Sequence, residues 1–534
     1  MKKALLIFSL FFNFCLFSEA QFKQIAEGPK FTEPEEGYAK ILQMKNGSVF
    51  YLSIYYKTGI DIRIYDASHA QKVVTHITLS SRITEFHEVE SIFEINNDIV
   101  LFLSDAEELA PVLYRITIDA NTGKLKEEKT ICTLKKGGGS YVLSGETRFF
   151  SVSKDPYSDN YAIAFYHVKE NEREKRIEVV HYGNDHREIS RVFCISPDAD
   201  RSFFLYINMT VINSEKVYAF LFATKEKYFF KKKGNVLMAT IEKGSVSYSN
   251  VNFPEDLPIT GGLSRYNPVT KKIILLTVAR ENFTEYSIYS TIIDPVTKKM
   301  QMISDVGSGE KVNIAYKERF SKKSGYSGMP QNLFINDDGS FSILYEEIQV
   351  QTEGGKFGGR TDTKLGKVVV ATYDKNGTIA SNYLVPKEHW ALLERLVPFY
   401  HSRKERTAQF LYMGNQYKSF AYLNGVNKNY VLFNDTERNN EVNKDKFVEV
   451  QAISECDAFM YELTGNDVFP KREYTLGKSA NVKEHNLLMY AVADYDKKNN
   501  VYVTLRLDKE EGANKDVKLV GYSHNNFLTS LRTQ

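Results

Sequence analysis

The residues that could do chemistry in this chain are few and widely spaced. Glu346 and Glu347 are adjacent acids, and a pair of carboxylates is what glycoside hydrolysis requires. In an extended strand, however, neighbouring side chains point to opposite faces. These two carboxylates therefore cannot share one site, and the sequence predicts no glycosidase centre there.

Two glycine-rich stretches resemble catalytic loops only in part. Residues 325–328 read Gly-Tyr-Ser-Gly, so the final glycine comes one place too early for a nucleophile elbow, and no strand-then-helix pattern surrounds it. Residues 137–140 read Gly-Gly-Gly-Ser but lack the Gly-Lys-Ser/Thr of a phosphate loop. The first stretch predicts a turn, and the second predicts no phosphate site.

Metal ligands are also too sparse to form a site. His181 and His186 flank a predicted hairpin turn, but zinc needs a third and usually a fourth ligand, and no local Cys or His supplies one. The acidic stretches at residues 198–200 and 336–339 are too short for a calcium loop and predict turns. We therefore expect no catalytic residue, no metal and no cofactor.

The first twenty residues have the pattern of a signal peptide. Lys2 and Lys3 precede an apolar run over residues 4–17, and a small-x-small site ends at Ala20. The run of about fourteen residues is short of the roughly 20 needed to span a bilayer, which favours cleavage over an uncleaved anchor. Cys15 lacks the small neighbours of a lipidation site. We predict an exported mature protein over residues 21–534, with no later transmembrane segment.

Composition favours strands. The chain has 34 Tyr and 35 Phe, which are strand formers. With 69 basic and 67 acidic residues it lacks the excess charge of a general nucleic-acid binder. Cys132, Cys194 and Cys456 remain after signal cleavage, too few for a disulfide framework. Three buried thiols are the simpler prediction, and one bridge between Cys132 and Cys194 is the alternative.

The elements that must position any site are repeated hairpins. Residues 331–345 form two strand-like runs around Asn-Asp-Asp-Gly, and residues 367–385 form two more around Asp-Lys-Asn-Gly. An Asp/Asn-Gly turn between β-branched and aromatic runs is a strong hairpin signal. Together the two hairpins predict a four-stranded antiparallel meander.

Both hairpins recur along the chain in a fixed order. Their predicted turns lie at residues 46–47, 96–98, 157–159, 213–215, 267–272, 427–429 and 497–499 for the first hairpin, and at 66–68, 119–123, 181–184, 242–244, 294–298 and 465–467 for the second. The spacing of roughly fifty to ninety residues is longer and less regular than in common propeller repeats. A sequential meander of four-stranded units still predicts an all-β protein, a single β-propeller domain of four-stranded antiparallel blades. A β-sandwich would need Greek-key crossings.

The last unit is incomplete. Residues 487–492, 501–506 and 517–522 predict three strands, with no clear fourth. Residues 22–26 could supply it, which would join both ends of the chain in one blade and remove an exposed edge. We therefore predict eight blades, with seven as the alternative.

Insertions interrupt the pattern. Residues 351–365 are rich in glycine and predict a long loop, which is the one segment that we keep as a candidate for function. Trp390, Leu393 and Val397 have helical spacing, so residues 386–397 predict one short inserted helix. Residues 434–445 predict a solvated loop, and the basic residues 225–233 predict a hairpin tip.

Over residues 325–441 the chain resembles a family of exported bacterial proteins of uncharacterised function. The resemblance is carried by Asp-Gly-Ser-Phe at 338–341, the strand at 366–373 with Lys-Asn-Gly at 375–377, Leu-Val-Pro-Lys at 384–387, and residues 430–435 with Arg438 and Asn439. It implies a secreted, propeller-like protein and carries over no activity and no functional residue.

Function is expected in the loops that a propeller presents around its channel. We expect a non-enzymatic binding or scaffold protein with a protein or glycan partner at the cell envelope, and no nucleic-acid partner. The alternatives are an enzyme acting on polysaccharide or peptide at the channel mouth, and a structural subunit of an envelope assembly. The single Trp leaves Tyr to supply any platform on which sugars would stack.

Overall fold

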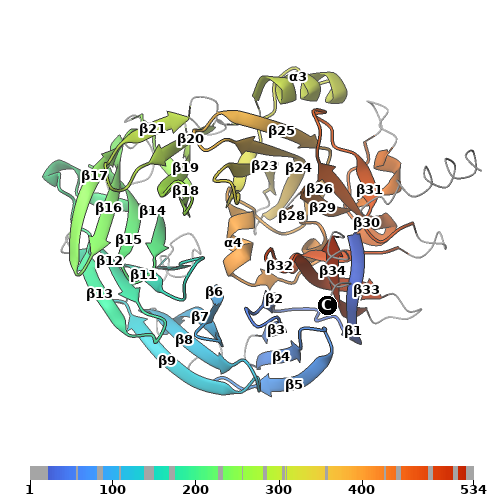
Figure 1. Ribbon diagram of the computed structural model, residues 1–534, viewed down its shortest axis with the longest axis horizontal. Helices are drawn as coiled ribbons and strands as arrows, with labels where there is room; N and C mark the ends of the chain where they lie inside the picture. The colour runs from blue at the N-terminus through green and yellow to red at the C-terminus, as the bar shows by residue number, and fades with distance from the viewer. Residues whose placement is uncertain are drawn as a thin grey trace, which may run out of the picture.

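Eight antiparallel sheets form a closed ring, which is a β-propeller (Figure 1). The computed structural model describes residues 22–55, 58–80, 88–107, 110–136, 149–167, 175–225, 233–254, 257–280, 286–303, 307, 309–354, 359–425, 428–440, 447–478, 485–508 and 515–524. The prediction of four-stranded blades, eight in number, is confirmed.

The strands follow one another from the centre of the ring outwards in each blade. Blades 1 to 4 consist of β2 (Tyr38–Gln43), β3 (Val49–Tyr55), β4 (Gly59–Tyr65) and β5 (Gln71–Ile77); β6 (Glu88–Ile95), β7 (Asp98–Glu107), β8 (Ala110–Asp119) and β9 (Leu125–Thr133); β10 (Phe150–Lys154), β11 (Tyr161–Tyr166), β12 (Ile177–Tyr182) and β13 (Glu188–Phe193); and β14 (Phe203–Ile212), β15 (Lys216–Thr224), β16 (Gly234–Glu242) and β17 (Ser245–Val251).

Blades 5 to 8 are built in the same way. They consist of β18 (Ile259–Asn267), β19 (Lys272–Arg280), β20 (Tyr286–Ile293) and β21 (Met300–Ile303); β22 (Met329–Ile335), β23 (Phe341–Glu353), β24 (Arg360–Tyr373) and β25 (Ile379–Val385); β28 (Ala421–Asn424), β29 (Asn429–Thr436), β30 (Cys456–Leu463) and β31 (Arg472–Tyr474); and β32 (Leu488–Asp496), β33 (Val501–Asp508), β34 (Asp516–His524) and β1 (Phe22–Thr32).

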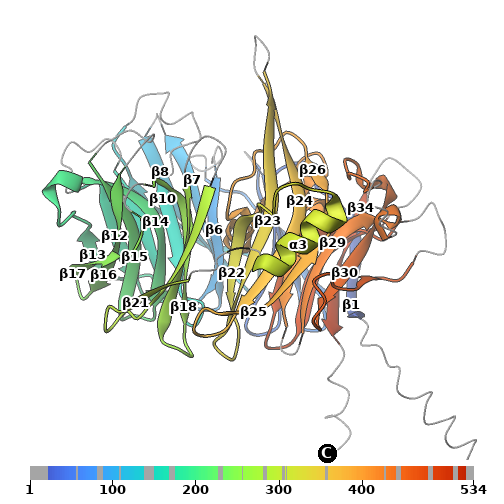
Figure 2. The ribbon, with the colours of Figure 1, turned by 90° about the horizontal axis from the view of Figure 1, so that it is seen from above.

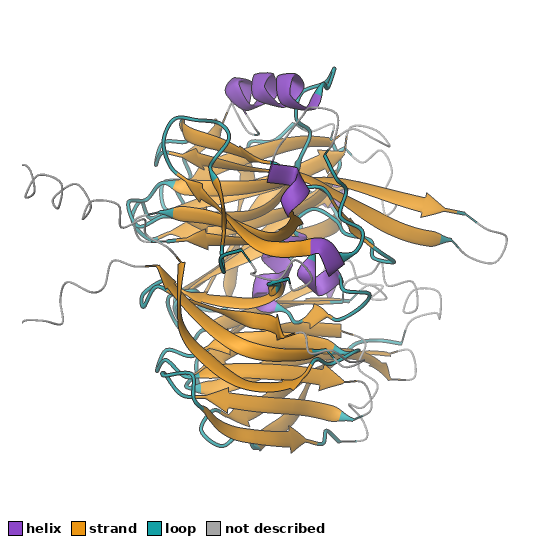
Figure 3. Ribbon diagram, turned by 90° about the vertical axis from the view of Figure 1, so that its right-hand side faces the viewer, coloured by secondary structure: helices purple, strands orange, loops and turns teal. Residues whose placement is uncertain are grey.

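Two further strands and two α-helices complete the described chain. They are β26 (His389–Ala391), β27 (Gln409–Phe410), α3 (Gly309–Phe320) and α4 (Tyr400–Arg406). Short 3-10 turns are η2 (Ala199–Arg201), η3 (Asn415–Tyr417), η4 (Glu437–Asn440) and η5 (Ile453–Glu455). Strands make up nearly all of the ring, and α3 lies on its outside (Figure 3). No helix of the described residues is long and apolar enough to cross a membrane.

The N-terminal strand closes the ring, as predicted. β1 pairs with β34 in antiparallel register, from Phe22 opposite His524 to Thr32 opposite Asp516. The first strand of the chain is therefore the outer strand of the last blade. Because it pairs with β34, that strand does not present a free edge.

The turn prediction is confirmed because polar side chains close the hairpins. Asp374 Oδ1 accepts hydrogen bonds from the backbone N–H of Asn376 and Thr378 at 2.8 and 2.9 Å. Gly377 then takes a positive φ of 85°, which glycine adopts without a steric penalty. Asp119 closes its turn in the same way with Asn121 and Thr122.

Neighbouring blades pack face to face, so the core is divided into clusters around the ring. Ala162 and Ala164 of β11 and Val217 of β15, for example, belong to one buried cluster between blades 3 and 4. β15 is buried from Val217 to Thr224, because both faces of its sheet are covered.

The prediction of a long loop at residues 351–365 is wrong. β23 and β24 continue beyond blade 6 as a two-stranded hairpin, and the Thr352 and Thr361 hydroxyls hydrogen-bond across it at 3.2 Å. The alternating polar and β-branched residues pair as strands, which outweighs the local glycine content. The hairpin projects from one face of the ring, which we call the hairpin face (Figure 2). The opposite face, which carries the turns between the first and second strands of each blade, is the turn face.

The inserted helix lies later than predicted. Residues 389–391 form β26, which pairs with β24, and the helix is α4, over Tyr400–Arg406. Leu393 has a φ of 54°, a left-handed conformation that a right-handed helix excludes. The apolar spacing of Trp390, Leu393 and Val397 is thus not a helical stripe.

The expectation for residues 434–445 changes at its start. Asn434 and Asp435 belong to β29 and are buried, so the solvated loop does not begin there. Asn434 donates to the carbonyl oxygens of Tyr417 and Leu488 at 2.8 and 2.7 Å, which links blade 7 to blade 8. The prediction of three free thiols is confirmed, although only Cys194 and Cys456 are buried and Cys132 is half-buried. The predictions for residues 1–20 and 137–140, and for most of 225–233, lie outside the described residues.

Candidate functional site

A single insertion fills the centre of the ring. Residues 386–420, which we call the cap segment, connect blade 6 to blade 7 and place α4 in the middle of the propeller (Figure 1). The backbone N–H of Phe399 donates to the Pro330 carbonyl at 2.9 Å at the start of the helix. After the helix, β27 adds to the inner edge of blade 1 by pairing with β2. The cap segment is therefore held at both ends by blades.

Polar side chains of four blades and a backbone carbonyl of a fifth contact α4. Lys40 of β2 donates to the carbonyl oxygens of Lys404 and Glu405 at 3.0 and 2.8 Å, where a cation is favourable at a helix C-terminus. Contacts from the other four blades are Glu88 with Arg403, Val152 O with Arg406, Arg265 with Glu405, and Asn332 with Glu405. The helix is thereby fixed in a channel whose polar groups would otherwise face water.

A buried ion pair anchors the cap segment to blade 6. Lys387 Nζ lies 2.8 Å from Glu346 Oε1, and both side chains are fully buried. The Tyr400 hydroxyl donates to the other carboxylate oxygen of Glu346. Burial lowers the pKa of Lys387, but the carboxylate of Glu346 opposes this shift. One carboxylate on β23 thus holds both the start of the cap segment and the start of α4.

Titratable groups of α4 have perturbed pKa values. Burial lowers the pKa of His401 to about 3 and that of Lys404 to about 8. Burial raises the pKa of Glu405, although Arg265 and Asn332 oppose this shift. Such clusters are common at active sites, and interlocked structural groups produce them as well.

One contact has the geometry of a nucleophile and its base. Lys404 Nζ donates to Ser419 Oγ at 3.0 Å, within the reach that general-base activation of a serine requires. Ser419 is only 2% exposed, however, and an acyl substrate must reach the hydroxyl oxygen. The pair therefore connects α4 to the start of blade 7 rather than presenting a nucleophile.

Acid should loosen the cap segment through His401, which stacks on Phe420 at 4.8 Å. The unfolded chain binds a proton below pH 6.5, whereas folded His401 does so only near pH 3. Stability from this group is thus complete above pH 6.5 and is lost as pH falls. We expect His401→Gln to remove a pH-dependent loss on the order of 2–3 kcal/mol between pH 6.5 and about pH 4. Urea titrations at both pH values measure it.

The control for this substitution is His76→Gln. His76 is an exposed histidine of β5 that pairs with Asp61, far from the cap segment in the sequence. If His401→Gln and the wild type lose equal stability on acidification, His401 does not couple the fold to pH.

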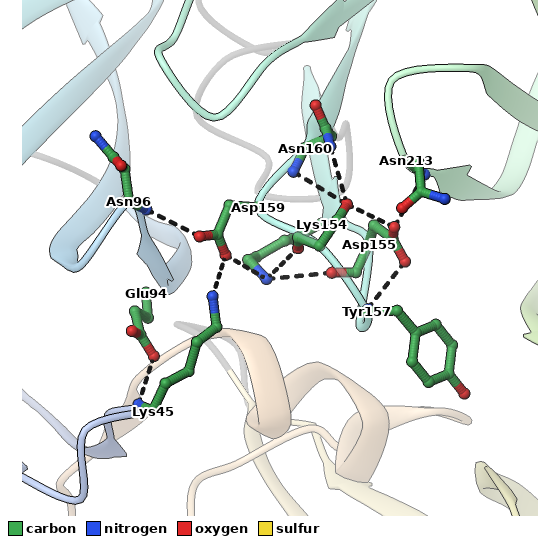
Figure 4. A network of polar contacts seen from close by, with 10 residues as sticks. Lys45, Glu94, Asn96, Lys154, Asp155, Tyr157, Asp159, Asn160 and Asn213 are labelled. Carbon is green, nitrogen blue, oxygen red and sulfur yellow. Dashed lines mark hydrogen bonds and ion pairs between the residues drawn. The ribbon is translucent and has the colours of Figure 1, made fainter.

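A second polar network joins four blades on the turn face (Figure 4). Asp159 accepts hydrogen bonds from Lys45 Nζ at 2.6 Å and Asn96 N at 3.1 Å, and Lys154 Nζ lies 3.3 Å away. Burial raises the pKa of Asp159, but the two lysines and the Asn96 N–H lower it below its ordinary value.

The neighbouring Asp155 extends this network to blade 4. Its Oδ2 accepts from the Asn213 N–H at 2.9 Å, and its Oδ1 accepts from the Tyr157 N–H at 3.0 Å. The carboxylates of both aspartates are matched with donors from neighbouring turns. This arrangement holds the blades together and presents no free reactive group.

The apolar surface of the cap segment is the feature that internal packing does not explain. Large apolar side chains that remain exposed in this segment are Leu393, Val397, Phe410, Tyr412 and Met413. Two of them, Leu393 and Met413, have φ angles of 54° and 51°, in a region that favours glycine or asparagine.

The residues singled out by the sequence are not gathered in one place. Glu346 binds Lys387 and Tyr400, whereas Glu347 accepts a hydrogen bond from Tyr316 at 2.5 Å. The two adjacent acids therefore have different hydrogen-bond partners. Tyr326, in the Gly-Tyr-Ser-Gly stretch, donates to the Lys367 carbonyl at 2.9 Å.

The two histidines also have separate partners. His181 Nε2 lies 3.0 Å from the Asn213 carbonyl oxygen, and His186 Nδ1 lies 3.2 Å from the Tyr161 hydroxyl. Among the described residues, no group of three or more His, Cys, Asp or Glu side chains could hold a metal ion. Asp338 closes a turn through Ser340.

The sequence reasoning missed the later half of the cap segment. The available signal was the run Phe410-Leu411-Tyr412-Met413, which has no place in the blade pattern. Only Leu411 of these four is buried, because it turns into the cluster between blades 1 and 8.

No protein-family model matches the chain, and no curated protein matches it, which is consistent with a family of unknown function. Solved structures of similar architecture include the polysaccharide lyase Uly1, 8% identical, with a TM-score of 0.39, over 94% of this chain and 100% of that chain. Prolyl oligopeptidase B from Galerina marginata is 8% identical, with a TM-score of 0.40, over 89% and 55%. The β-propeller domain of the Trilobed protease from Pyrococcus furiosus is 11% identical, with a TM-score of 0.32, over 67% and 98%. Such a likeness does not extend to activity.

Proposed function

We propose that this protein is an exported, non-enzymatic binding protein that holds a protein or glycan partner at the cell envelope through its hairpin face. The observation that carries the proposal is the cap segment, which fills the ring centre with partnered polar groups and leaves five large apolar side chains exposed. The outer surface of the cap segment is available to a partner.

Backbone strain at Leu393 and Met413 supports a role of their exposed side chains in binding a partner. Leu393 is 46% exposed and Met413 is 56% exposed, so neither side chain offsets its left-handed backbone by burial. A bulky residue in this region costs roughly 1–2 kcal/mol, and such strain is concentrated at functional sites. Asn415 joins the loops that carry Leu393 and Met413. Its Oδ1 accepts a hydrogen bond from the Leu392 N–H at 3.1 Å, and its Nδ2 donates to the Leu392 carbonyl at 2.9 Å.

The projecting hairpin belongs to the same surface. β26 pairs with β24 at Thr363, Lys364 and Leu365, and the Leu393 N–H donates to Asp362 Oδ1 at 2.8 Å. The cap segment and the hairpin therefore form one rigid unit. A rigid surface loses little conformational entropy on binding.

Photo-crosslinking from single positions on the hairpin face and on the turn face tests this proposal. A benzophenone side chain placed at Leu393 or Met413 is expected to give crosslinked adducts in cells that produce the protein. The same group at Val269 or Val296 is the matched control, because both valines are exposed apolar residues in turns of the turn face.

The adducts are compared by mobility, protein staining and glycan staining. Adducts from the hairpin-face positions that are absent from the controls support the proposal. Equal adducts from both faces, or adducts from Val269 and Val296 alone, contradict it.

A further inference from the structure

Three aromatic side chains form a row at the rim of blade 1. Tyr38 and Phe410 have ring centroids 5.3 Å apart, and Phe410 and Tyr412 have centroids 5.9 Å apart with ring planes only 19° from parallel. Phe410 is 42% exposed and Tyr412 is 41% exposed. We call these three residues the aromatic row.

The backbone keeps the row rigid. Tyr38 of β2 lies opposite Phe410 of β27, and the Leu411 N–H donates to the Gly37 carbonyl at 2.9 Å. Phe410 and Tyr412 are two residues apart in an extended segment, which places both side chains on the same side. The chain then reverses, with the Asn415 N–H bonded to the Tyr412 carbonyl at 2.9 Å.

Charged groups lie beside the aromatic row. Arg403, on the last turn of α4, forms an ion pair with Glu88 of β6, and its guanidinium interacts electrostatically with Tyr38. Side chains of Arg403 and Glu88 are 43% and 37% exposed. A charged pair therefore lies near Tyr38, at one end of the aromatic row.

We infer that the aromatic row binds a sugar chain, with pyranose rings stacked on the exposed Phe410 and Tyr412 next to Tyr38, and hydroxyl groups bonded by Arg403 and Glu88. This inference rests on the proposed binding function and names its ligand class. The face of an aromatic ring carries partial negative charge, and the C–H groups on one face of a pyranose carry partial positive charge. Equatorial hydroxyls point outwards from the same sugar ring, toward polar partners.

Sugar fits this row better than the other ligands that stack on aromatic rings. Single-stranded nucleic acid also stacks in this way, but it requires a positively charged groove along its backbone. The chain as a whole has a formal net charge of only +2, and Arg403 beside the row is paired with Glu88. Tyrosine and phenylalanine have few rotatable bonds, so ordering them costs little when a ligand binds.

Calorimetry with defined oligosaccharides tests the inference on the full mature chain. The probes are cellohexaose, chitohexaose and a galacturonic acid hexamer, which cover neutral, N-acetylated and acidic sugars. We expect at least one probe to bind, and Phe410→Ala and Tyr412→Ala each to weaken that binding by about tenfold or more. Tyr412→Phe keeps the ring and should bind within about twofold of the wild type.

Tyr157→Ala is the matched control, because Tyr157 is an exposed tyrosine in a turn of the turn face. Its affinity for the probe should equal that of the wild type. Phe410 lies in β27, so Phe410→Ala is checked by thermal unfolding. Tyr412 lies outside β27, so the affinity of Tyr412→Ala tests the aromatic row without altering a residue of that strand. Emission from Trp390, the only tryptophan, reports binding at the cap segment.

The results separate this inference from the function on which it rests. Failure of all three probes to bind, or equal binding by the alanine variants and the wild type, overturns the sugar site. If sugar binding fails while Leu393 and Met413 crosslink a protein, the binding function stands with a protein partner. If the hairpin-face crosslinks are also absent, both proposals fail.

Discussion

Lys387→Met is expected to lower the free energy of unfolding by about 3–5 kcal/mol, because it leaves a buried carboxylate without its cation. Glu346 and Lys387 are fully buried, and their charged atoms lie 2.8 Å apart. Tyr400 satisfies only the other oxygen of Glu346. Methionine has a similar volume, so the loss reports the missing charge rather than a cavity. Urea unfolding followed by circular dichroism measures the change.

Lys126→Met is the matched control for that substitution. Lys126 is exposed and pairs with Asp98 at 2.7 Å, and such a pair contributes about 0–1 kcal/mol. Adding Glu346→Gln to Lys387→Met should recover much of the lost stability, because it removes the unpaired charge. A cost for Lys387→Met no larger than that for Lys126→Met would show that the buried pair does not hold the cap segment.

Deleting residues 1–32 is expected to open the ring and to cause association between molecules. The deletion removes β1, so β34 becomes an edge strand with unpaired backbone groups. It also removes Phe31, which is buried against Tyr51 and beneath Arg63. Loss of one buried Phe side chain costs about 3–5 kcal/mol, so the total loss should be larger. Thermal unfolding and size-exclusion chromatography with light scattering measure both effects.

The control is a variant that lacks only residues 1–21. This shorter deletion stops just before β1 and leaves that strand intact. Its unfolding temperature and its state of association should equal those of the protein that comprises residues 21–534. A monomeric, equally stable protein without residues 1–32 would mean that blade 8 does not need its fourth strand.

Local signals in the sequence were sufficient for the blades. Asp374 and Gly377, or Asp119 and Gly123, specify a hairpin turn through contacts within a few residues. Such turns between β-branched runs fix which strands pair, and their repetition fixes the ring. The closing strand could be found because an unfinished last blade needed a partner.

The cap segment could not be read in the same way. The polar sequence Tyr400–Arg406 has no apolar stripe, because its partners are Lys40, Arg265 and Asn332, which are remote in the chain. The local apolar spacing instead predicted the helix at residues 386–397. In the structure, part of this stretch forms β26 because it pairs with β24. The glycine-rich hairpin was misread for a different reason, since its strands pair with each other over a few residues and the local glycine content hid that pattern.

The sequence by itself determined the eight-bladed scaffold, because its hairpins depend on contacts between residues that are close in the chain. Only the tertiary structure decided what occupies the channel and which large apolar side chains of residues 386–420 remain exposed. Those features arise when residues 386–420 meet five blades and β27 joins β2, and no local period records such distant contacts. The surface that we propose to be functional is one of the features that depend on such distant contacts.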